Sequence, residues 1–176
     1  NPLPYITDET EPLARVYGVQ DIAHPDRRGR LPKGFQFRFG NTGSNTFPET
    51  HVLKYNLDDT GSKYLALWAS SDQNGDSLML RLEYSFDPGF VVETVEYVTG
   101  WTAQNTVSPT LQFVIREDRL QLYEDQPGTL VMELMFPPPI EITGPVTLDL
   151  FSRIETDRPG VDTFLISDIL IYDAYL

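Results

Sequence analysis

The sequence has no cysteine, only three lysines and two histidines, and no long apolar run. Without cysteine there can be no disulfide framework, no thiolate nucleophile and no cysteine-ligated zinc site. No stretch of about 18 apolar residues is present to cross a membrane. Because 26 acidic residues face 13 basic ones, the formal net charge is −13, which repels a nucleic-acid backbone. The composition therefore argues against membrane insertion and against nucleic acid as a partner.

Catalytic motifs are also scarce. The two histidines, His24 and His51, fall in a proline-rich loop and at a strand start, and no serine stands in a Gly-x-Ser-x-Gly turn. Jelly-roll glycosidases need two carboxylates about 5 to 10 Å apart, usually at alternating positions of one strand. Glu93 and Glu96 are three residues apart and would face opposite ways. A lyase that takes Arg, Tyr and His from several strands leaves no local motif, so this enzymatic alternative stays open.

Short segments of alternating hydrophobicity, separated by turn residues, make up most of the chain. Helical periodicity is nowhere sustained over three turns. The pattern predicts one all-β domain over residues 1–176, an antiparallel two-sheet β-sandwich of the jelly-roll type, with residues 1–34 as an N-terminal arm and loop. We expect strands at 14–19, 35–39, 51–57, 64–70, 78–85, 91–99, 111–116, 119–123, 130–136, 146–153 and 161–176.

The last of these segments, residues 161–176, is apolar on both faces, which predicts a strand in the middle of a sheet that is covered on both sides. Asp168 lies among its apolar side chains. An ionised carboxylate in such surroundings needs a cation, a set of hydrogen bonds or a metal. Two interpretations stay open: backbone hydrogen bonds at a sheet corner, or a structural calcium ion, whose preferred ligands are carboxylate and carbonyl oxygens.

Aromatic and arginine side chains supply the candidate binding residues. Trp68 and Tyr64 fall on the strand face opposite Leu65 and Leu67, and Trp101 follows a glycine at a strand end. Such rings either fill a core or form a platform on which a sugar ring packs its C–H face. Further polar residues at alternating positions could line one groove and donate to a sugar hydroxyl or carboxylate, above all the arginines. They are Arg38, Arg81, Glu83, Gln112, Arg116, Glu133 and Arg153.

The order of the segments over residues 35–176 resembles a known superfamily. GFQFRFG is followed by KYLALWAS, a turn, LMLRLEYS, a Val/Tyr/Trp segment and the closing LISDILIYDA. This layout resembles the β-jelly-roll carbohydrate-binding modules and lectin-like domains of extracellular glycan-degrading systems. The resemblance implies aromatics presented to sugars and a structural Ca²⁺ between the N-terminal arm and the last strand. Asp168 would then be a ligand, with Asp8, Glu9 or Glu11 as its partners.

Together these features predict a non-catalytic module that binds a polysaccharide or oligosaccharide. The chain begins without Met, as a mature or excised domain would, and we expect an extracellular or cell-surface protein, standing alone or joined to a larger enzyme. One alternative is a polysaccharide lyase or glycoside hydrolase of the same fold. A second is a structural or adhesion domain of a surface or viral assembly, in which all aromatics lie in the core. Two features distinguish these alternatives: the exposure of Trp68 and Trp101, and whether two carboxylates or a set of Arg, Tyr and His converge in a groove.

Overall fold

The computed structural model describes residues 14–17, 33–44, 49–71, 77–86, 93–102, 110–125, 128–137, 140, 147–154 and 162–173. Within these ranges the chain forms eleven β-strands and no helix. The strands are β1 (Ala14–Tyr17), β2 (Lys33–Ser44), β3 (Glu49–Asn56), β4 (Tyr64–Ser71), β5 (Ser77–Ser85), β6 (Glu93–Thr102), β7 (Thr110–Ile115), β8 (Arg119–Glu124), β9 (Thr129–Met135), β10 (Thr147–Ile154) and β11 (Asp162–Asp173). No described segment is a helix long and apolar enough to span a membrane.

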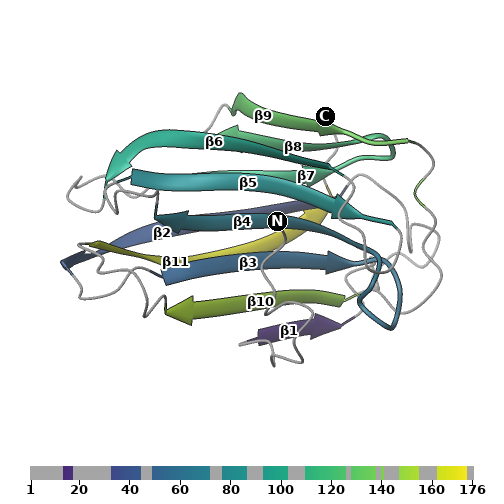
Figure 1. The fold of residues 1–176 in the computed structure, drawn as a ribbon, viewed down its shortest axis with the longest axis horizontal. Helices are drawn as coiled ribbons and strands as arrows, with labels where there is room; N and C mark the ends of the chain where they lie inside the picture. The colour runs from purple at the N-terminus through teal and green to yellow at the C-terminus, as the bar shows by residue number, and fades with distance from the viewer. Residues whose placement is uncertain are drawn as a thin grey trace.

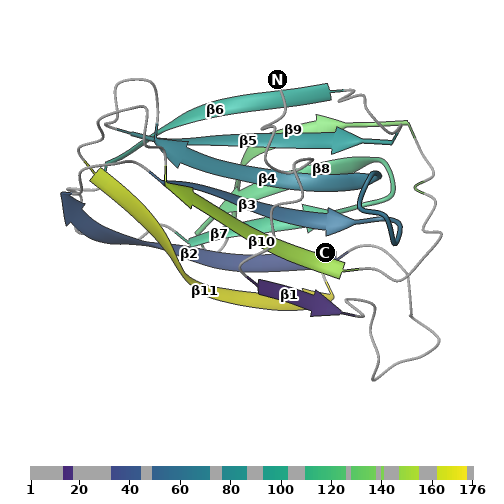
Figure 2. The same cartoon turned by 60° about the horizontal axis from the view of Figure 1, so that its bottom comes forward.

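The strands form two antiparallel sheets that pack face to face (Figures 1 and 2). The six-stranded sheet has the order β1-β10-β3-β4-β5-β6, and the five-stranded sheet has the order β11-β2-β7-β8-β9. The chain leaves the five-stranded sheet after β9 and next joins the six-stranded sheet at β10. The all-β, two-sheet prediction is confirmed.

Alternation of side chains along the strands builds the core between the sheets. In β4, Leu65 and Leu67 are buried against residues of the opposite sheet, which include Leu111 and Phe113 of β7. Phe35 of β2 lies in the middle of this layer, where its ring centroid is 5.8 Å from that of Tyr55 and 6.1 Å from that of Phe113. Because successive side chains of a strand point to opposite faces, burying these positions directs the residues between them to the outer faces.

One bulge changes this alternation in the β8–β9 hairpin. Leu122 lies opposite Met132, but the next residue, Tyr123, lies opposite Leu130, so Val131 has no opposing residue. Val131 packs against the core as the extra residue. As a result Leu130, which simple alternation would place with Met132 inside, is 46% exposed on the outer face.

Two predictions about strand placement are wrong. β11 is the edge strand of its sheet, not a central strand, and Leu170 within it is 57% exposed. Apolar composition on both faces predicts burial, but it carries no information on how many neighbouring strands a segment has. The strand predicted over residues 35–39 is also too short, because β2 continues through the GNTGS segment to Ser44, where its register with β11 shifts between Asp162 and Phe164.

Replacing Leu67 with Ala tests the inner-face assignment. Leu67 is almost fully buried, so the change removes apolar contacts and leaves a cavity, and we expect unfolding to become easier by about 2–5 kcal/mol. Leu130→Ala is the matched control on an exposed site, with an expected change of about 0.5 kcal/mol or less. Urea unfolding measures both; equal effects would mean that the strand faces are assigned wrongly.

Candidate functional site

The structure divides the predicted binding residues between two opposite outer faces. Tyr64, Trp68 and Arg81 lie on the outer face of the six-stranded sheet, where Trp68 is opposite Arg81 in the β4–β5 register. Arg116 follows β7 and contacts Gln121 on the outer face of the five-stranded sheet. Arg81 and Arg116 therefore cannot line the same groove. Alternation predicted that they point outward, but it cannot say to which sheet a strand belongs.

Three further predicted residues are located only by their backbone. Trp101 lies near the end of β6, Arg38 lies in β2 and Asp168 lies in β11, and their side chains are outside the described part of the structure. Glu9 and Glu11 lie outside the described residues altogether. The roles predicted for these five residues remain predictions.

The aromatic rings on the six-stranded sheet are not an open platform. Trp68 is 3% exposed and Tyr64 is 4% exposed, and both belong to a small apolar cluster with Val52, Ala66 and Phe151. A cation lies over each ring: the Arg81 guanidinium carbon is 4.5 Å from the Trp68 ring centroid, and Lys54 Nζ is 4.6 Å from that of Tyr64. The packed interpretation of these two rings is the one that the structure shows, and a sugar cannot stack directly on either.

A row of charged residues crosses this same face. The register places Arg15, Asp149, Lys54, Ala66 and Glu83 side by side on β1, β10, β3, β4 and β5. Arg15 donates two hydrogen bonds to the Asp149 carboxylate, from Nε at 2.7 Å and from Nη2 at 2.9 Å, and Asn56 Nδ2 donates a third at 3.0 Å. The buried Asp149 is thereby compensated within the sheet, as a buried charge must be.

Glu83 forms the other half of the row. Its side chain is fully buried, and its Oε2 accepts a hydrogen bond of 2.8 Å from the Tyr64 hydroxyl. Its Oε1 is 3.6 Å from Arg81 Nη2, and Arg81 also lies 3.9 Å from the exposed Glu96. Burial, together with the nearby Glu83 carboxylate, raises the pKa of Tyr64 well above its usual range, so the phenol stays a hydrogen-bond donor at all ordinary pH values.

Lys54 is the most strongly perturbed cation of the row. Its Nζ donates a hydrogen bond of 2.7 Å to the Gly61 carbonyl oxygen. Burial disfavours the charged ammonium more than the nearby Asp149 and Asp58 favour it, so the pKa of Lys54 falls from 10.5 to about 8. The face that holds the predicted aromatic platform is thus a buried network of mutually engaged groups.

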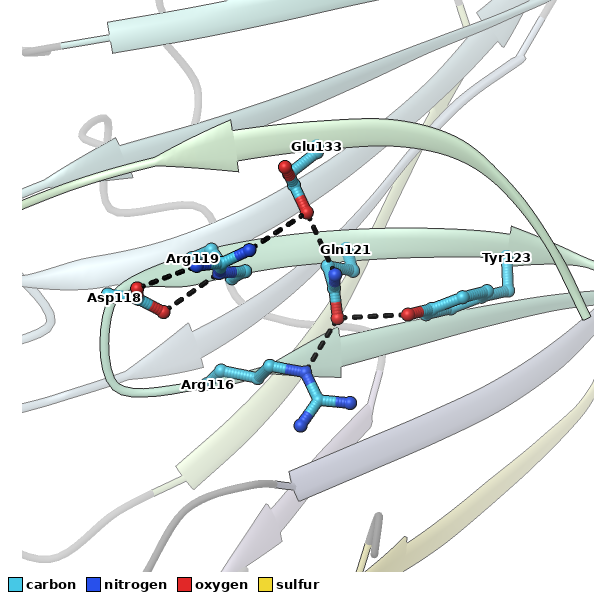
Figure 3. Close-up of polar contacts among 6 residues, drawn as sticks. All are labelled: Arg116, Asp118, Arg119, Gln121, Tyr123 and Glu133. Carbon is cyan, nitrogen blue, oxygen red and sulfur yellow. Dashed lines mark hydrogen bonds and ion pairs between the residues drawn. The ribbon is translucent and has the colours of Figure 1, made fainter. Parts of the chain in front are cut away.

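The outer face of the five-stranded sheet carries a different, more accessible group of polar side chains, which we call the Gln121 cluster: Arg116, Gln121, Tyr123 and Glu133 (Figure 3). Gln121 is its centre and is 7% exposed. Its Oε1 accepts hydrogen bonds from Arg116 Nε at 2.6 Å and from the Tyr123 hydroxyl at 3.0 Å, and its Nε2 donates to Glu133 Oε2 at 2.8 Å.

Arg116 differs from the other arginines whose side chains are described. Arg15 pairs with Asp149, Arg81 lies near Glu83 and Glu96, and Arg119 forms two hydrogen bonds of 2.9 Å with Asp118. Arg116 instead makes its one hydrogen bond to a neutral amide, through Nε. Figure 3 shows its two terminal nitrogens directed away from Gln121, and neither has a hydrogen-bond partner among the described residues.

Tyr123 extends the cluster into a row across the sheet. The register places it next to Gln112, Gln36 and the exposed Leu170 on one side and next to Leu130 on the other. Its ring is half-buried and lies against the hairpin residue Gly128, where an added Cβ would come within 3.0 Å of Tyr123 Cβ and 3.3 Å of Gln112 Oε1. Glycine at this position leaves the room that Tyr123 and Gln112 occupy.

The groups on this face are of the kinds that can exchange hydrogen bonds with hydroxyl groups. Amide, phenol, carboxylate and guanidinium groups are held in fixed directions by one another, and a half-buried ring lies beside them. Sequence reasoning included Gln112, Arg116 and Glu133 but missed Gln121 and Tyr123. The signal was present, because the segment RLQLY in β8 alternates with Leu120 and Leu122 inside and the polar residues outside.

For calcium the structure supplies one relevant observation. The backbone of Asp168 lies directly opposite that of Arg38 in the β11–β2 ladder, next to a register shift. Oppositely charged residues at directly paired positions stabilise a sheet, so the sequence offers Asp168 a compensating cation without a metal. Among the described residues there is no group of three or more His, Asp or Glu arranged to hold a metal ion.

Comparison with known proteins identifies the fold. No protein-family model matches the sequence, and no curated protein matches it. Sheep galectin-11, solved in complex with glycerol, aligns over 93% of this chain and 98% of its own with a TM-score of 0.57 at 11% identity. The carbohydrate-binding module CBM2 of the evolved Dit protein of Lactobacillus casei BL23 phage J-1 aligns over 92% of this chain and 70% of its own, with a TM-score of 0.57 at 14% identity.

A third similar structure is an enzyme. The GH16 protein of a Bacteroides ovatus mixed linkage glucan locus, in complex with its product, aligns over 83% of this chain and 73% of its own, with a TM-score of 0.56 at 10% identity. Identities this low show the fold alone. The chain has the β-jelly-roll fold that these three structures share, as the order of its segments predicted.

The perturbed pKa of Lys54 predicts a specific pH dependence of stability. Above pH 8 the folded protein releases the Lys54 proton, whereas the unfolded chain keeps it up to about 10.5, so the unfolded state binds more protons and the free energy of unfolding rises with pH. We expect the wild type to gain about 2–3 kcal/mol relative to Lys54→Met between pH 8 and 10. Urea unfolding at several pH values measures the difference, and parallel curves for the two proteins would contradict it.

Proposed function

We propose that this protein binds glycans without chemical turnover, through the Gln121 cluster together with Gln112 on the outer face of the five-stranded sheet. The observation that carries the proposal is Arg116, whose terminal nitrogens are directed away from Gln121 without a partner among the described residues, while the Tyr123 hydroxyl bonds the same amide oxygen. Sugars are recognised by planar polar side chains that exchange hydrogen bonds with hydroxyls, next to a ring that packs on their C–H faces. The Gln121 cluster brings both kinds of group together.

The opposite face supports this choice by contrast. On the six-stranded sheet Trp68 and Tyr64 are covered, and the carboxylates of Asp149 and Glu83 already accept hydrogen bonds from Arg15 and Tyr64. A ligand at this face would have to displace existing ion pairs and hydrogen bonds. We assign this face a structural role, because breaking buried pairs costs more than surface contacts return.

The non-catalytic part of the proposal depends on the carboxylates. Glu96 lies opposite Arg81 on the outer face, and Glu93 lies opposite Tyr84, whose side chain belongs to the core, so these two positions are on opposite faces. On the proposed binding face, Glu133 accepts a hydrogen bond from Gln121 and lies 3.5 Å from Arg119 Nη1. Because Glu133 already has these two partners, we assign it a role in holding the surface together rather than in proton transfer.

A glycan array, read without and with calcium, tests the proposed function. We expect the wild type to bind at least one polysaccharide, and Tyr123→Ala and Arg116→Gln each to weaken that binding at least tenfold, as truncation of a central contact does. Lys63→Gln, which removes the same charge from a loop of the six-stranded sheet, is the control and should bind like the wild type. The variant Trp101→Ala is tested on the same array, because Trp101 remains a predicted sugar-stacking residue.

Two results would reject this assignment. A soluble, folded wild type that binds nothing on a broad array favours the structural or adhesion alternative. Binding that survives both Tyr123→Ala and Arg116→Gln but is lost in Trp101→Ala would place the site on the six-stranded sheet, where β6 lies. Release of shortened sugars from a bound polysaccharide would instead favour the enzymatic alternative.

An extracellular location and a structural calcium held partly by Asp168 complete the proposal. Binding to the folded state alone would stabilise the protein by about 2.7 kcal/mol at a calcium concentration one hundred times the dissociation constant. Chelator should therefore lower the melting temperature of the wild type and leave that of Asp168→Ala unchanged. If neither melting curve responds to chelator or calcium, while Arg38→Gln lowers the melting temperature, the pairing of Arg38 with Asp168 replaces the metal in this account.

A further inference from the structure

We infer that the glycan bound by the Gln121 cluster carries a carboxylate, as a uronic acid does, and that this group pairs with the terminal nitrogens of Arg116. The inference rests on the proposed function and names the chemical class of its ligand. It depends on three features of the described residues: the direction of the free donors of Arg116, the charge that surrounds them, and the way in which Gln121 holds them.

The free donors of Arg116 have the geometry that a carboxylate requires. Its Nε–H is used by Gln121 Oε1 at 2.6 Å, which leaves the N–H groups on both terminal nitrogens. The guanidinium is planar, so one N–H from each terminal nitrogen points outward in parallel. Two parallel donors match the two oxygens of a carboxylate in a bidentate pair, which is stronger and more directional than a hydrogen bond to a neutral hydroxyl.

The charge balance around Arg116 also favours an anion. Each of the other arginines with a described side chain has at least one carboxylate partner within 4 Å: Asp149 for Arg15, Glu83 and Glu96 for Arg81, and Asp118 and Glu133 for Arg119. Among the described residues, Arg116 is hydrogen-bonded to the neutral Gln121 amide alone, and the Asp118 carboxylate, which is held mainly by Arg119, attracts it only at longer range. A guanidinium that is not paired with a carboxylate among the described residues is complementary to a ligand that supplies the negative charge itself.

Gln121 fixes the direction of the Arg116 side chain. Its Oε1 accepts from two donors, Arg116 and Tyr123, while its Nε2 donates to the Glu133 carboxylate. Turning the amide over would set its NH₂ group against two donors and its oxygen against a carboxylate, so only one orientation satisfies all three neighbours. The guanidinium is therefore held before the ligand arrives, which reduces the entropy lost on binding.

The overall charge of the protein limits the form of the ligand. A net charge of −13 repels a long polyanion, and this repulsion acts over distances of about 10 Å at moderate salt. A single pair with Arg116 acts at contact distance, so it favours a short oligosaccharide, or a glycan in which acidic residues are widely spaced. Short acidic oligosaccharides are therefore the appropriate probes.

The test compares oligosaccharides of galacturonate, guluronate and glucuronate with counterparts in which each carboxyl group has been reduced to a primary alcohol. The reduction removes the charge and keeps every ring and the other hydroxyls. We expect isothermal titration to show at least one uronate binding tenfold or more tightly than its reduced form. Arg116→Gln should abolish this preference, and Arg116→Lys, which keeps the charge but not the fork, should reduce it several-fold. Lys63→Gln should leave the preference unchanged.

The possible outcomes separate this inference from the proposed function. Equal affinity of the wild type for the acidic and reduced forms, with loss of binding in Tyr123→Ala, would overturn the carboxylate assignment and leave glycan binding in place. A preference that persists in a folded Arg116→Gln variant would also overturn it, because the carboxylate would then bind elsewhere. If no glycan, acidic or neutral, is bound by the wild type, both the inference and the proposed function fall.

Discussion

The whole arrangement depends on the contact between the inner faces of the two sheets. Leu65, Leu67 and their neighbours in β5 must meet Phe35, Leu111 and Phe113 from the other sheet, and a shift of one residue in any pairing would turn these side chains outward. The side chains at the positions between them must therefore face outward. Each outer face is therefore composed of the residues that the core does not use, and the two outer faces can differ widely because the same core supports both.

The two faces do differ in how they satisfy their charges. The six-stranded sheet holds Asp149 and Glu83 in buried contacts with Arg15, Tyr64 and Arg81, so its charges compensate one another across the strands. The five-stranded sheet uses an amide, Gln121, as the common partner of a cation, a phenol and a carboxylate. An amide can join these groups without cancelling the charge of Arg116. This difference allows one face to be closed and the other to remain available.

Much of this could be read from the sequence, and the reasons for the failures are specific. Period-two alternation located the strands and separated Leu67 from Trp68, and the order of the segments predicted the jelly roll. Alternation could not show that Arg81 and Arg116 lie on opposite faces, because membership of a sheet is set by pairing between distant segments. It could not show that Trp68 is covered, because packed and exposed aromatics have the same pattern. The alternation in β8 did indicate that Gln121 and Tyr123 face outward, because they alternate with buried leucines.

The bulge at Val131 has a consequence for how this protein can vary. Val131 is the one residue of β9 without an opposing residue in β8, so the strand could lose it and still place Leu130 beside Tyr123 and Glu133 beside Gln121. The hairpin would lose the contact of Val131 with the core, and its local twist would change. The length of β9 can therefore vary by this one residue without changing which residues face outward. Related sequences could gain or lose a residue here. Such a change would alter the direction of the outward side chains at this edge of the sheet, while Met132 and Leu134 keep their places in the core.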